Sequence, residues 1–344
     1  MVSERGLQVL RAIVEDFVET NEPVGSKSIV ERHAFGVSAA TIRNDMAQLE
    51  DEDLIVAPHT SSGRVPTDKG YRVFVDHLAQ LRPLSSAQRS AITAFLTDPA
   101  DLDDLMVRTV RVLTRLTGQV ALAQYPSFAR AHVTHVELVA LAPNRLLTVL
   151  VTDAGGVSQR IVTLPADLDD AEIAVVRARL TVLLTGRSVR RGLEGIAALQ
   201  DAPETTPLGI AQAALVRAVS EELEEFRQER LVMAGAATLA RREHDFRGSI
   251  HPLLEAIEEQ VTLLRLMSEM VTDEQGLAAS IGAENEAFGL PEASIVASNY
   301  MSPGGTARVG VMGPTRMDYP SNLAAARAVA RYLSRLLDED EAGR

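Results

Sequence analysis

The stretch Ser38–Tyr71, SAATIRNDMAQLEDEDLIVAPHTSSGRVPTDKGY, constrains this chain most, because a helical pattern, a short strand pattern and a basic loop follow one another without interruption. The helix is predicted to begin at Ser38, a good N-cap, and to bury a regularly spaced apolar stripe. That stripe is Ile42, Met46 and Leu49. The opposite face carries Ala39, Ala40, Arg43, Asn44 and Gln48. Arginine can pair with guanine and asparagine or glutamine with adenine, so this face could read DNA bases, although any solvated helix also turns polar residues outward.

Two predicted helices precede this stretch. Apolar residues at helical spacing predict the first over Glu4–Thr20, and the sequence NEPVG ends it with a proline and a glycine. The second is predicted to begin with Ser26 as N-cap and to bury Ile29 and Val30. The turn of four or five residues before Ser38 has helix-turn-helix spacing, which favours the DNA-reading interpretation.

A predicted wing follows the third helix. Leu54–Val56 is suited to a short strand, and Pro58 and Pro66 bracket the loop HTSSGRV. Ser61, Ser62 and Gly63 are small enough for the backbone to approach a phosphate, and Arg64 could enter a minor groove or pair with phosphate. A polar loop of this kind can also be plain solvated surface.

A fourth helix is predicted after Thr67 as N-cap, with Lys69 and Arg72 near its start. Tyr71 is expected to pack against the base of the wing and not to stack on a nucleotide. Between His59 and Arg72 the charge is positive, with three cationic residues against Asp68 alone.

The remaining chain has an α+β pattern. Arg82–Ser86 is the best linker, and an amphipathic helix over 102–116 could join domains or form part of a dimer seam. Strands are predicted at 132–141, 146–152, 157–164, 294–298 and 308–312, with helices over 167–230, 250–270 and 321–337. This order indicates one α+β domain whose sheet is completed late, with helices inserted in the middle. The acidic end, Asp338–Glu341, is predicted to be disordered.

Charge and composition exclude several protein classes. The net charge of −13 argues against a nonspecific nucleic-acid coat protein, and residues 1–90 hold 10 Lys and Arg against 13 Asp and Glu. DNA binding must therefore depend on the placement of a few cations. The only lysines, Lys27 and Lys69, lie outside any Walker motif. The absence of cysteine, of a signal-peptide pattern and of a long apolar run leads us to expect a cytoplasmic protein without membrane contact.

No catalytic residue, metal site or cofactor is predicted. His132 and His135 should point to opposite faces of a strand, and the carboxylate pairs at 221–222 and 224–225 should form a solvated face. The motif GPTRMDYP, Gly313–Pro320, could bind a phosphate or small ligand, or it could be a rigid connection in which Arg316 and Asp318 make local hydrogen bonds. An enzyme that uses this turn is a distant rival interpretation.

Four segments resemble the heat-inducible transcription repressor HrcA family of bacteria. They are NEPVGSKSI, ATIRNDMAQLE, PHTSSGRVPTDKGYRVFVDHL and GPTRMDYP. The resemblance implies a winged helix-turn-helix domain (1–82), a GAF-like domain (119–164 and 229–337) and a dimerisation segment inserted into it (165–228). The linker and amphipathic helix (83–118) follow from the residues themselves, and the acidic tail (338–344) departs from the family pattern. The resemblance also implies a homodimer that represses chaperone operons at an inverted-repeat operator called CIRCE and is kept active by the GroEL chaperonin.

The hypothesis for DNA binding places the residues in three groups. Ser38, Thr41, Arg43 and Asn44 lie at the major-groove helix, Ser61, Ser62, Gly63 and Arg64 hold backbone or minor groove, and Lys27, Lys69 and Arg72 neutralise phosphate. Five cations per subunit would give a dimer about ten phosphate contacts and a log–log salt slope as steep as roughly −9. In an alternative, the GAF-like domain senses a small molecule that controls the repressor.

Overall fold

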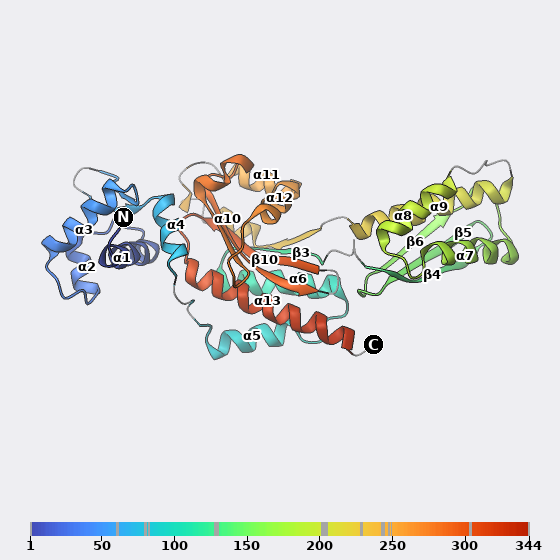
Figure 1. Cartoon of the computed structure of the whole chain (residues 1–344), viewed down its shortest axis with the longest axis horizontal. Helices are drawn as coiled ribbons and strands as arrows, with labels where there is room; N and C mark the ends of the chain where they lie inside the picture. The colour runs from blue at the N-terminus through green and yellow to red at the C-terminus, as the bar shows by residue number, and fades with distance from the viewer. Residues whose placement is uncertain are drawn as a thin grey trace. The chain divides into compact units, whose positions relative to one another are not determined.

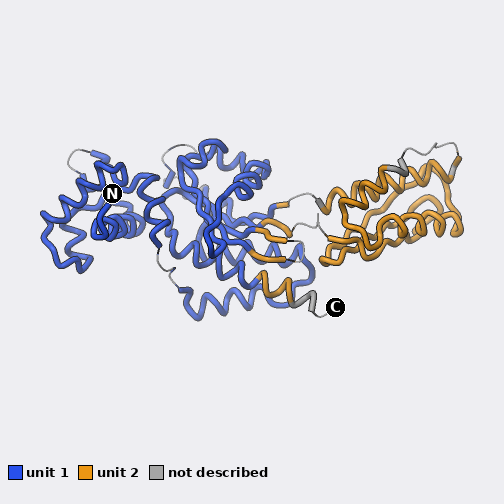
Figure 2. Tube along the Cα trace, in the orientation of Figure 1, with its two compact units in different colours: residues 1–123, 231–299, 308–332 blue, residues 124–230, 300–307, 333–344 orange. Residues whose placement is uncertain are grey.

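A computed structural model describes residues 2–59, 62–78, 81, 83–126, 131–200, 206–227, 230–241, 245–246, 248, 250–302 and 305–342 (Figure 1). The chain divides into two compact units, which Figure 2 shows in different colours. Unit 1 comprises Met1–Ala123, Leu231–Asn299 and Arg308–Tyr332, and unit 2 comprises Gln124–Arg230, Tyr300–Ala307 and Leu333–Arg344. Within the described residues, no helix combines the length and apolar character needed to cross a membrane.

The N-terminal segment of unit 1 consists of helices and one small antiparallel ribbon. Its elements are α1 (Glu4–Thr20), α2 (Ser26–Arg32), α3 (Ala39–Asp51), β1 (Ile55–Val56), β2 (Val65–Pro66) and α4 (Asp68–Asp76). β1 and β2 pair antiparallel, with Ile55 opposite Pro66. The order of the four helices and of β1 agrees with the sequence prediction.

Two details at α2 differ from the prediction. Gly25 occupies the N-cap position and Ser26 is already helical and buried, so the helix begins one residue early. Ile29 is fully buried as expected, whereas Val30 is 36% exposed. Adjacent helical positions differ in direction by about 100°, so a two-turn helix buries Ile29 without burying its neighbour.

The larger part of unit 1 is built on a five-stranded sheet with strand order β7-β3-β10-β9-β8. The strands are β3 (Val120–Gln124), β7 (Leu231–Ala234), β8 (Leu277–Ile281), β9 (Ala293–Ser302) and β10 (Gly305–Pro314). The accompanying helices are α5 (Ser86–Leu96), α6 (Leu102–Thr117), α10 (Ala236–Arg241), α11 (His251–Glu259), α12 (Val261–Glu269), the 3-10 helix η2 (Gly282–Phe288) and α13 (Tyr319–Ala342).

Helices cover this sheet on both faces (Figure 1). On one face, Leu263, Leu266 and Met267 of α12 pack into the same apolar core as Ile295 of β9 and Met312 of β10. On the opposite face lie α6 and α13. The apolar stripe of α6 is buried within the chain, so it cannot also be the dimer seam that the sequence allowed.

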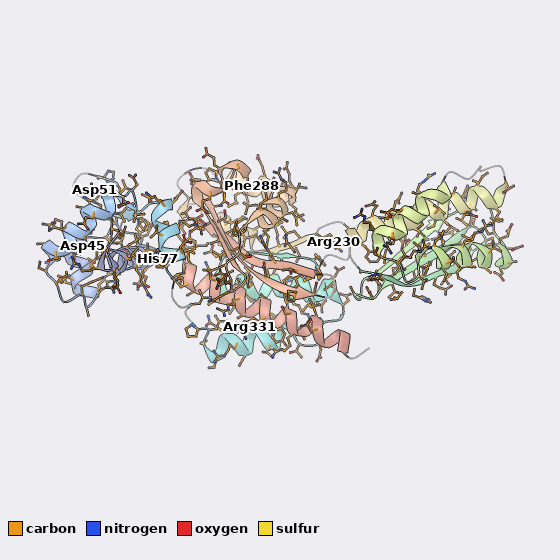
Figure 3. All side chains as sticks on the ribbon, viewed as in Figure 1. Asp45, Asp51, His77, Arg230, Phe288 and Arg331 are labelled. Atoms are coloured by element: carbon orange, nitrogen blue, oxygen red, sulfur yellow. The ribbon has the colours of Figure 1, made fainter. Side chains whose placement is uncertain are left out.

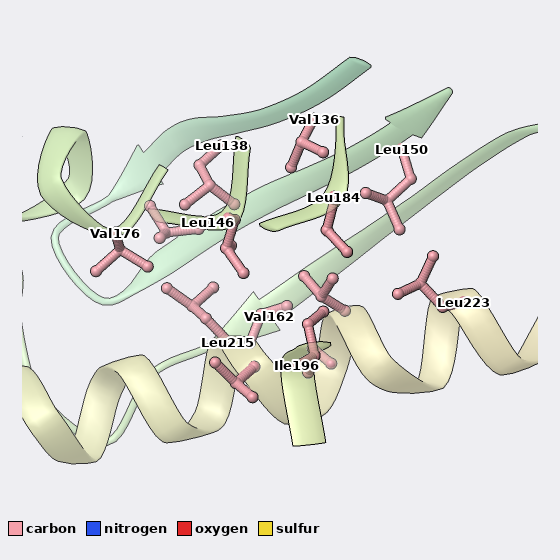
Figure 4. Packing of buried hydrophobic residues seen from close by; sticks show 14 of the residues in the cluster. Val136, Leu138, Leu146, Leu150, Val162, Val176, Leu184, Ile196, Leu215 and Leu223 are labelled. Carbon is pink, nitrogen blue, oxygen red and sulfur yellow. The ribbon is translucent and has the colours of Figure 1, made fainter. Parts of the chain in front are cut away.

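Unit 2 contains a separate three-stranded meander and three helices. Its strands are β4 (Val133–Ala142), β5 (Arg145–Thr152) and β6 (Val157–Thr163), and its helices are α7 (Asp170–Leu184), α8 (Val189–Gln200) and α9 (Pro207–Arg227). The three strands pair antiparallel in the order β4-β5-β6. Figure 4 shows how one face of the meander packs against the helices through residues such as Leu138, Leu146, Leu184 and Leu215.

This topology corrects the predicted assignment of strands. Residues 119–164 were expected to join 229–337 in the GAF-like domain, with only 165–228 inserted. Of the strands in 119–164, β3 alone joins the five-stranded sheet, and β4–β6 form their own. Local turns determine that β4, β5 and β6 pair with one another, whereas partners distant in sequence leave no local pattern. The inserted unit therefore begins near Gln124.

Two further expectations were wrong. Glu222 was assigned to a solvated carboxylate face, but it is 0% exposed, because it lies on the buried stripe of α9 with Ala218 and Phe226. The acidic end was expected to be disordered from residue 338, but α13 continues to Ala342. Leucine and glutamate favour helix, and no proline or glycine interrupts the run before Gly343.

Candidate nucleic-acid interface

Helix α3 exposes one continuous stripe of small and polar side chains. The exposed positions are Ala40, Arg43, Asn44, Ala47, Gln48 and Asp51. Their spacing of three and four residues places them on one face of the helix. Ile42, Met46 and Leu49 are buried on the other face, as predicted. Among the described residues, Arg43 and Asn44 have no side-chain hydrogen-bond or ion-pair partner, so both are available to a ligand.

The N-terminus of α3 is capped by Ser38. Its Oγ accepts a hydrogen bond from the Thr41 backbone N at 3.2 Å and lies 3.0 Å from Thr41 Oγ1. Ser38 is exposed and Thr41 is half-buried. The cap leaves the other amides of the first turn directed outward at the positive end of the helix dipole, which favours an approaching phosphate.

An ion pair that the sequence analysis missed fixes α3 against α1. The Arg5 guanidinium donates from Nε to Asp45 Oδ2 at 2.8 Å and from Nη2 to Asp45 Oδ1 at 3.0 Å. This fork raises the pKa of Arg5, because the Asp45 side chain hydrogen-bonds the charged guanidinium. Asp45 is only 4% exposed. An acidic residue within an apolar stripe needs a partner, and this signal could have identified the pair.

Acidic residues gather at the C-terminal end of α3. Glu50, Asp51, Glu52 and Asp53 follow one another there, and Figure 3 shows Asp51 at this end of the helix and Asp45 further back. The exposed stripe thus has its cation, Arg43, in the N-terminal half and its carboxylate, Asp51, at the C-terminal end. The N-terminal half is therefore the end of α3 that a polyanion can approach.

The β1–β2 loop directs its small residues inward. The Ser62 Oγ accepts from His59 N at 3.0 Å and donates to His59 O at 2.7 Å, which closes the turn. A Cβ on Gly63 would lie 2.6 Å from backbone atoms of Pro23 and Val24, so a larger residue cannot fit there. Ser61 lies outside the described residues. The glycine is required by this internal packing, whatever else approaches the loop.

Arg64 is engaged within the fold. Its backbone pairs with Val24, through N–H···O distances of 2.8 and 2.9 Å. Its guanidinium donates to Glu50 Oε2 from Nε at 3.0 Å and from Nη2 at 2.8 Å, and the side chain is 28% exposed. Arg64 therefore joins the loop to the end of α3.

The two lysines remain at the surface. Lys27 lies 3.8 Å from Glu31 on α2, and its side chain is 87% exposed. Lys69 donates to Glu52 O at 2.7 Å and is also exposed. These contacts are weak or at the surface, so both ammonium groups can reach an external anion.

Arg72 faces the five-stranded sheet. Its Nε donates to Glu284 Oε1 at 2.7 Å, and its Nη2 donates to Ala279 O at 2.7 Å. A second bond joins Nη2 to Glu284 Oε2. Tyr71, one residue earlier, is 1% exposed, and its ring centroid lies 5.6 Å from that of Tyr319. Tyr71 is thus a buried packing residue, and the aromatic ring that it meets belongs to Tyr319 and not to the wing.

No group of three or more His, Asp or Glu side chains within the described residues could hold a metal ion. His132 pairs with Asp153, at 3.1 Å between Nδ1 and Oδ2, and His135 lies 3.7 Å from Glu137. The two histidines therefore have separate partners.

Comparison with known proteins identifies relatives along the whole chain. A family model described as the HrcA protein C-terminal domain matches residues 103–322. A heat-inducible transcription repressor HrcA of Clavibacter michiganensis subsp. michiganensis is 61% identical, over 98% of this chain and 100% of the relative. Another, of Leifsonia xyli subsp. xyli, is 57% identical with the same coverage.

A solved structure has a similar fold. It is described as the crystal structure of a hypothetical protein at 2.2 Å resolution, and it is 26% identical to this chain. It covers 98% of this chain and 99% of its own, with a TM-score of 0.66. The match of a family model to most of the chain, together with full-length relatives that are more than half identical, shows that the chain belongs to the heat-inducible transcription repressor HrcA family.

Proposed function

We propose that this chain binds an inverted-repeat operator of the CIRCE type as a homodimer, represses chaperone genes there, and depends on the GroEL chaperonin for its active form. As a member of its family the chain is a transcription repressor and not an enzyme. The operator, the dimer and the chaperonin are the proposed parts.

The exposed stripe of α3 is the observation that carries this proposal. Arg43 and Asn44 extend from it without internal partners, and Ala40 and Ala47 leave room for the helix to approach a groove. We assign α1–α4 with the β1–β2 ribbon as a winged helix-turn-helix and α3 as its recognition helix. Thr41, Arg43 and Asn44 would meet base edges, and Ser38 would present the capped N-terminus to a phosphate.

The contacts of the other predicted DNA-binding residues within the fold reduce the number of residues that we assign to DNA. Lys27 and Lys69 are free enough to neutralise phosphates. Arg64 and Arg72 would have to break ion pairs first, so we assign both to holding the fold. Ser61, Ser62 and Gly63 remain candidates for backbone contacts of the wing.

The meander of the inserted unit supports a homodimer. Its face away from the helices carries exposed apolar side chains, with Val139 41%, Leu141 51%, Val157 62% and Ile161 53% exposed. Val139 and Ile161 flank Leu147 of the central strand in the pairing register, so the apolar residues form a continuous row. Exposed apolar patches of this kind mark interaction surfaces, and the same face of a second copy would cover it symmetrically. Two α3 helices would then meet two half-sites.

A second candidate function keeps DNA binding by α1–α4 and the β1–β2 ribbon, which we call the DNA-reading segment, but adds control by a small molecule. It is favoured by a cleft of about 1050 Å³ in unit 1, which is lined by residues of α4, β8 and α12, among them Arg72, and by Met270 directly after α12. A ligand there would adjoin the contact between Arg72 and Glu284. We assign the five-stranded sheet and its helices as the GAF-like domain in which this cleft lies.

One titration tests the proposal and separates the two candidates. Purified protein is titrated onto an inverted-repeat operator and onto a scrambled sequence at fixed salt, with and without chaperonin. We expect protection of both half-sites and tighter binding after chaperonin treatment. Equal affinity for the scrambled DNA would refute site-specific repression by this chain. The second candidate would be favoured if chaperonin leaves operator affinity unchanged and calorimetry detects binding of a metabolite.

A further inference from the structure

The motif Gly313–Pro320 between β10 and α13 is internally fixed. The Tyr319 hydroxyl donates to Thr315 O at 2.8 Å and lies 3.0 Å from Ser294 Oγ. Asp318 Oδ1 accepts from Ser321 N at 3.0 Å, which caps the start of α13. Met317 is 2% exposed. The motif is therefore a rigid part of the sheet domain, and nothing in these contacts calls for an enzyme.

Arg316 extends from this rigid motif to helix α1. Its Nη1 donates to Val18 O at 3.1 Å, and its Nη2 pairs with Asp245. The Arg316 side chain is 17% exposed and that of Asp245 is 7% exposed. Val18 lies in the last turn of α1, which has no basic residue of its own. A cation favours the negative end of a helix, so Arg316 supplies the charge that α1 lacks.

Helix α1 connects Arg316 to α3. Arg5, near the start of α1, holds Asp45 of α3 through two hydrogen bonds, while Val18, near its end, meets Arg316. Thirteen residues separate the two contacts, which corresponds to about 20 Å of helix. A tilt of about 10° at Val18 would therefore move the Arg5 end by roughly 3 Å.

A second set of contacts holds helix α4. Asp68 Oδ2 accepts from Ala283 N at 2.8 Å, and Arg72 pairs with Glu284. Gly282 has φ +52°, and a Cβ there would lie 2.2 Å from Asp68 Oδ2, so the approach is too close for another residue. Tyr319 of the motif also packs against Tyr71. The DNA-reading segment is thus fastened at both α1 and α4.

We infer that Arg316 is a positioning residue, which locks the DNA-reading segment to the five-stranded sheet and so sets the direction in which α3 is presented. This inference rests on the proposed function only for its DNA measurement, where the lock would fix the spacing between two recognition helices. Asp245 neutralises and orients the guanidinium for this task.

The lock can be measured without DNA. The chain contains no cysteine, so spin labels can be placed by Gln48→Cys on α3 and Arg331→Cys on α13, two exposed positions. Doubly labelled subunits are diluted with unlabelled protein so that only distances within one chain are recorded. We expect one narrow distance distribution in the parent and at least a doubling of its width in Arg316→Gln. Arg190→Gln, which removes an 80%-exposed guanidinium of the inserted unit, is the matched control and should keep the narrow distribution.

Two further variants keep the test decisive if Arg316→Gln does not fold. Asp245→Asn retains an oxygen acceptor without its charge, and Arg316→Lys retains charge without the fork that reaches two partners. Both should give intermediate widths. Parent-like distributions in every folded variant would overturn the inference.

The DNA measurement compares half-sites with inverted repeats of different spacer length. For Arg316→Gln, we expect single half-site affinity within about twofold of the parent and a loss of roughly tenfold or more on the inverted repeat, because bivalent binding depends on geometry. The penalty for lengthening the spacer by one base pair should also shrink. If the parent itself shows no preference for the inverted repeat, the proposed function fails while the distance measurement still tests the lock. If the variant keeps the parent's spacer dependence, the lock fails.

Discussion

Helix α3 and the β1–β2 loop have similar polar and cationic residues, yet the fold uses them differently. On α3, Arg43 and Asn44 extend to solvent without partners, while in the loop Ser62 closes a turn and Arg64 holds Glu50. The helix period determines which side chains of α3 face outward. A loop has no such period, so the direction of its side chains depends on elements elsewhere. Polar composition is therefore evidence for a binding surface on the helix and weak evidence in the loop.

The salt dependence of operator binding is the largest expected effect, and it tests whether Arg64 and Arg72 contact DNA in addition to the surface cations. If Lys27, Arg43 and Lys69 alone reach DNA, a dimer makes up to about six ionic contacts and the log–log slope is roughly −5. Raising salt from about 50 to 200 mM should then weaken operator binding by about 10³-fold. A slope near −9, measured by titration at several salt concentrations, would mean that Arg64 and Arg72 leave their partners on binding.

Substitution of Arg43 comes next in size. Arg43→Ala should cost about 1–3 kcal/mol of operator binding and relax discrimination at one base pair, because a bidentate base contact is lost. The measurement is a titration against operators substituted at single positions. Lys69→Ala is the control and should weaken all sequences about equally. Unchanged selectivity in Arg43→Ala would show that α3 is not the recognition helix.

The comparison extends to α9, where the helix period also decides exposure. Glu222 is fully buried among apolar residues, and the Thr148 hydroxyl donates a hydrogen bond to its Oε1. Burial raises the pKa of Glu222. The unfolded chain therefore releases this proton at lower pH than the folded chain, so stability falls as pH rises above about 4.3, the ordinary glutamate value, towards the raised one.

The substitution Glu222→Leu should remove the loss of stability that occurs as the pH rises. We expect about 1–3 kcal/mol more stability at pH 8 and little change at pH 4, because a buried carboxylate is replaced by an apolar side chain. Thermal melting of the full chain at the two pH values checks this. Glu194→Gln, at a 65%-exposed carboxylate, should show no such pH dependence. A destabilised Glu222→Leu at pH 8 would instead indicate that the carboxylate is needed in the core.

The smallest expected effect, that of Arg64→Ala, compares the β1–β2 loop with α3 most directly. Arg64→Ala should lower the free energy of unfolding by about 0.5–1 kcal/mol, since its pair with Glu50 is partly exposed, and should change operator affinity less than twofold. Glu50→Gln removes the other half of the pair and should behave alike. A large loss of operator affinity in Arg64→Ala alone would show that Arg64 contacts DNA. The β1–β2 loop and α3 would then both be binding surfaces.

Much of the architecture could be predicted from local patterns. The bounds of α1, the Ser38 and Thr67 caps and the strands of the meander follow from helical spacing, capping residues and turns. The pairing of β3 with β10 could not, because their partners lie almost 200 residues apart. The same limit applies to the site. Arg43 was correctly expected on the outer face, whereas Arg72 meets Glu284, and no nearby residue indicates that partner.

The motif Gly313–Pro320 shows a related limit. Its sequence stood out, and a ligand site and a rigid connection were both open. The structure supports the rigid connection for Asp318, which caps the next helix. For Arg316 the bonds are not local, since Val18 lies at the other end of the chain. A missing basic residue in the last turn of α1 was the one sequence signal of that contact.

The route by which the chain enters and leaves its inserted unit also bears on its evolution. The chain departs after β3 and returns at β7, two strands that are neighbours in the sheet. Close to these points, Tyr125 N donates to Arg230 O at 2.8 Å. Because the two ends of the insert are adjacent, a gene can gain, lose or exchange this block in one step without interrupting the sheet. The inserted unit, whose exposed apolar face we propose as the dimer surface, is thus a block that can be exchanged while the rest of the regulator stays intact around it.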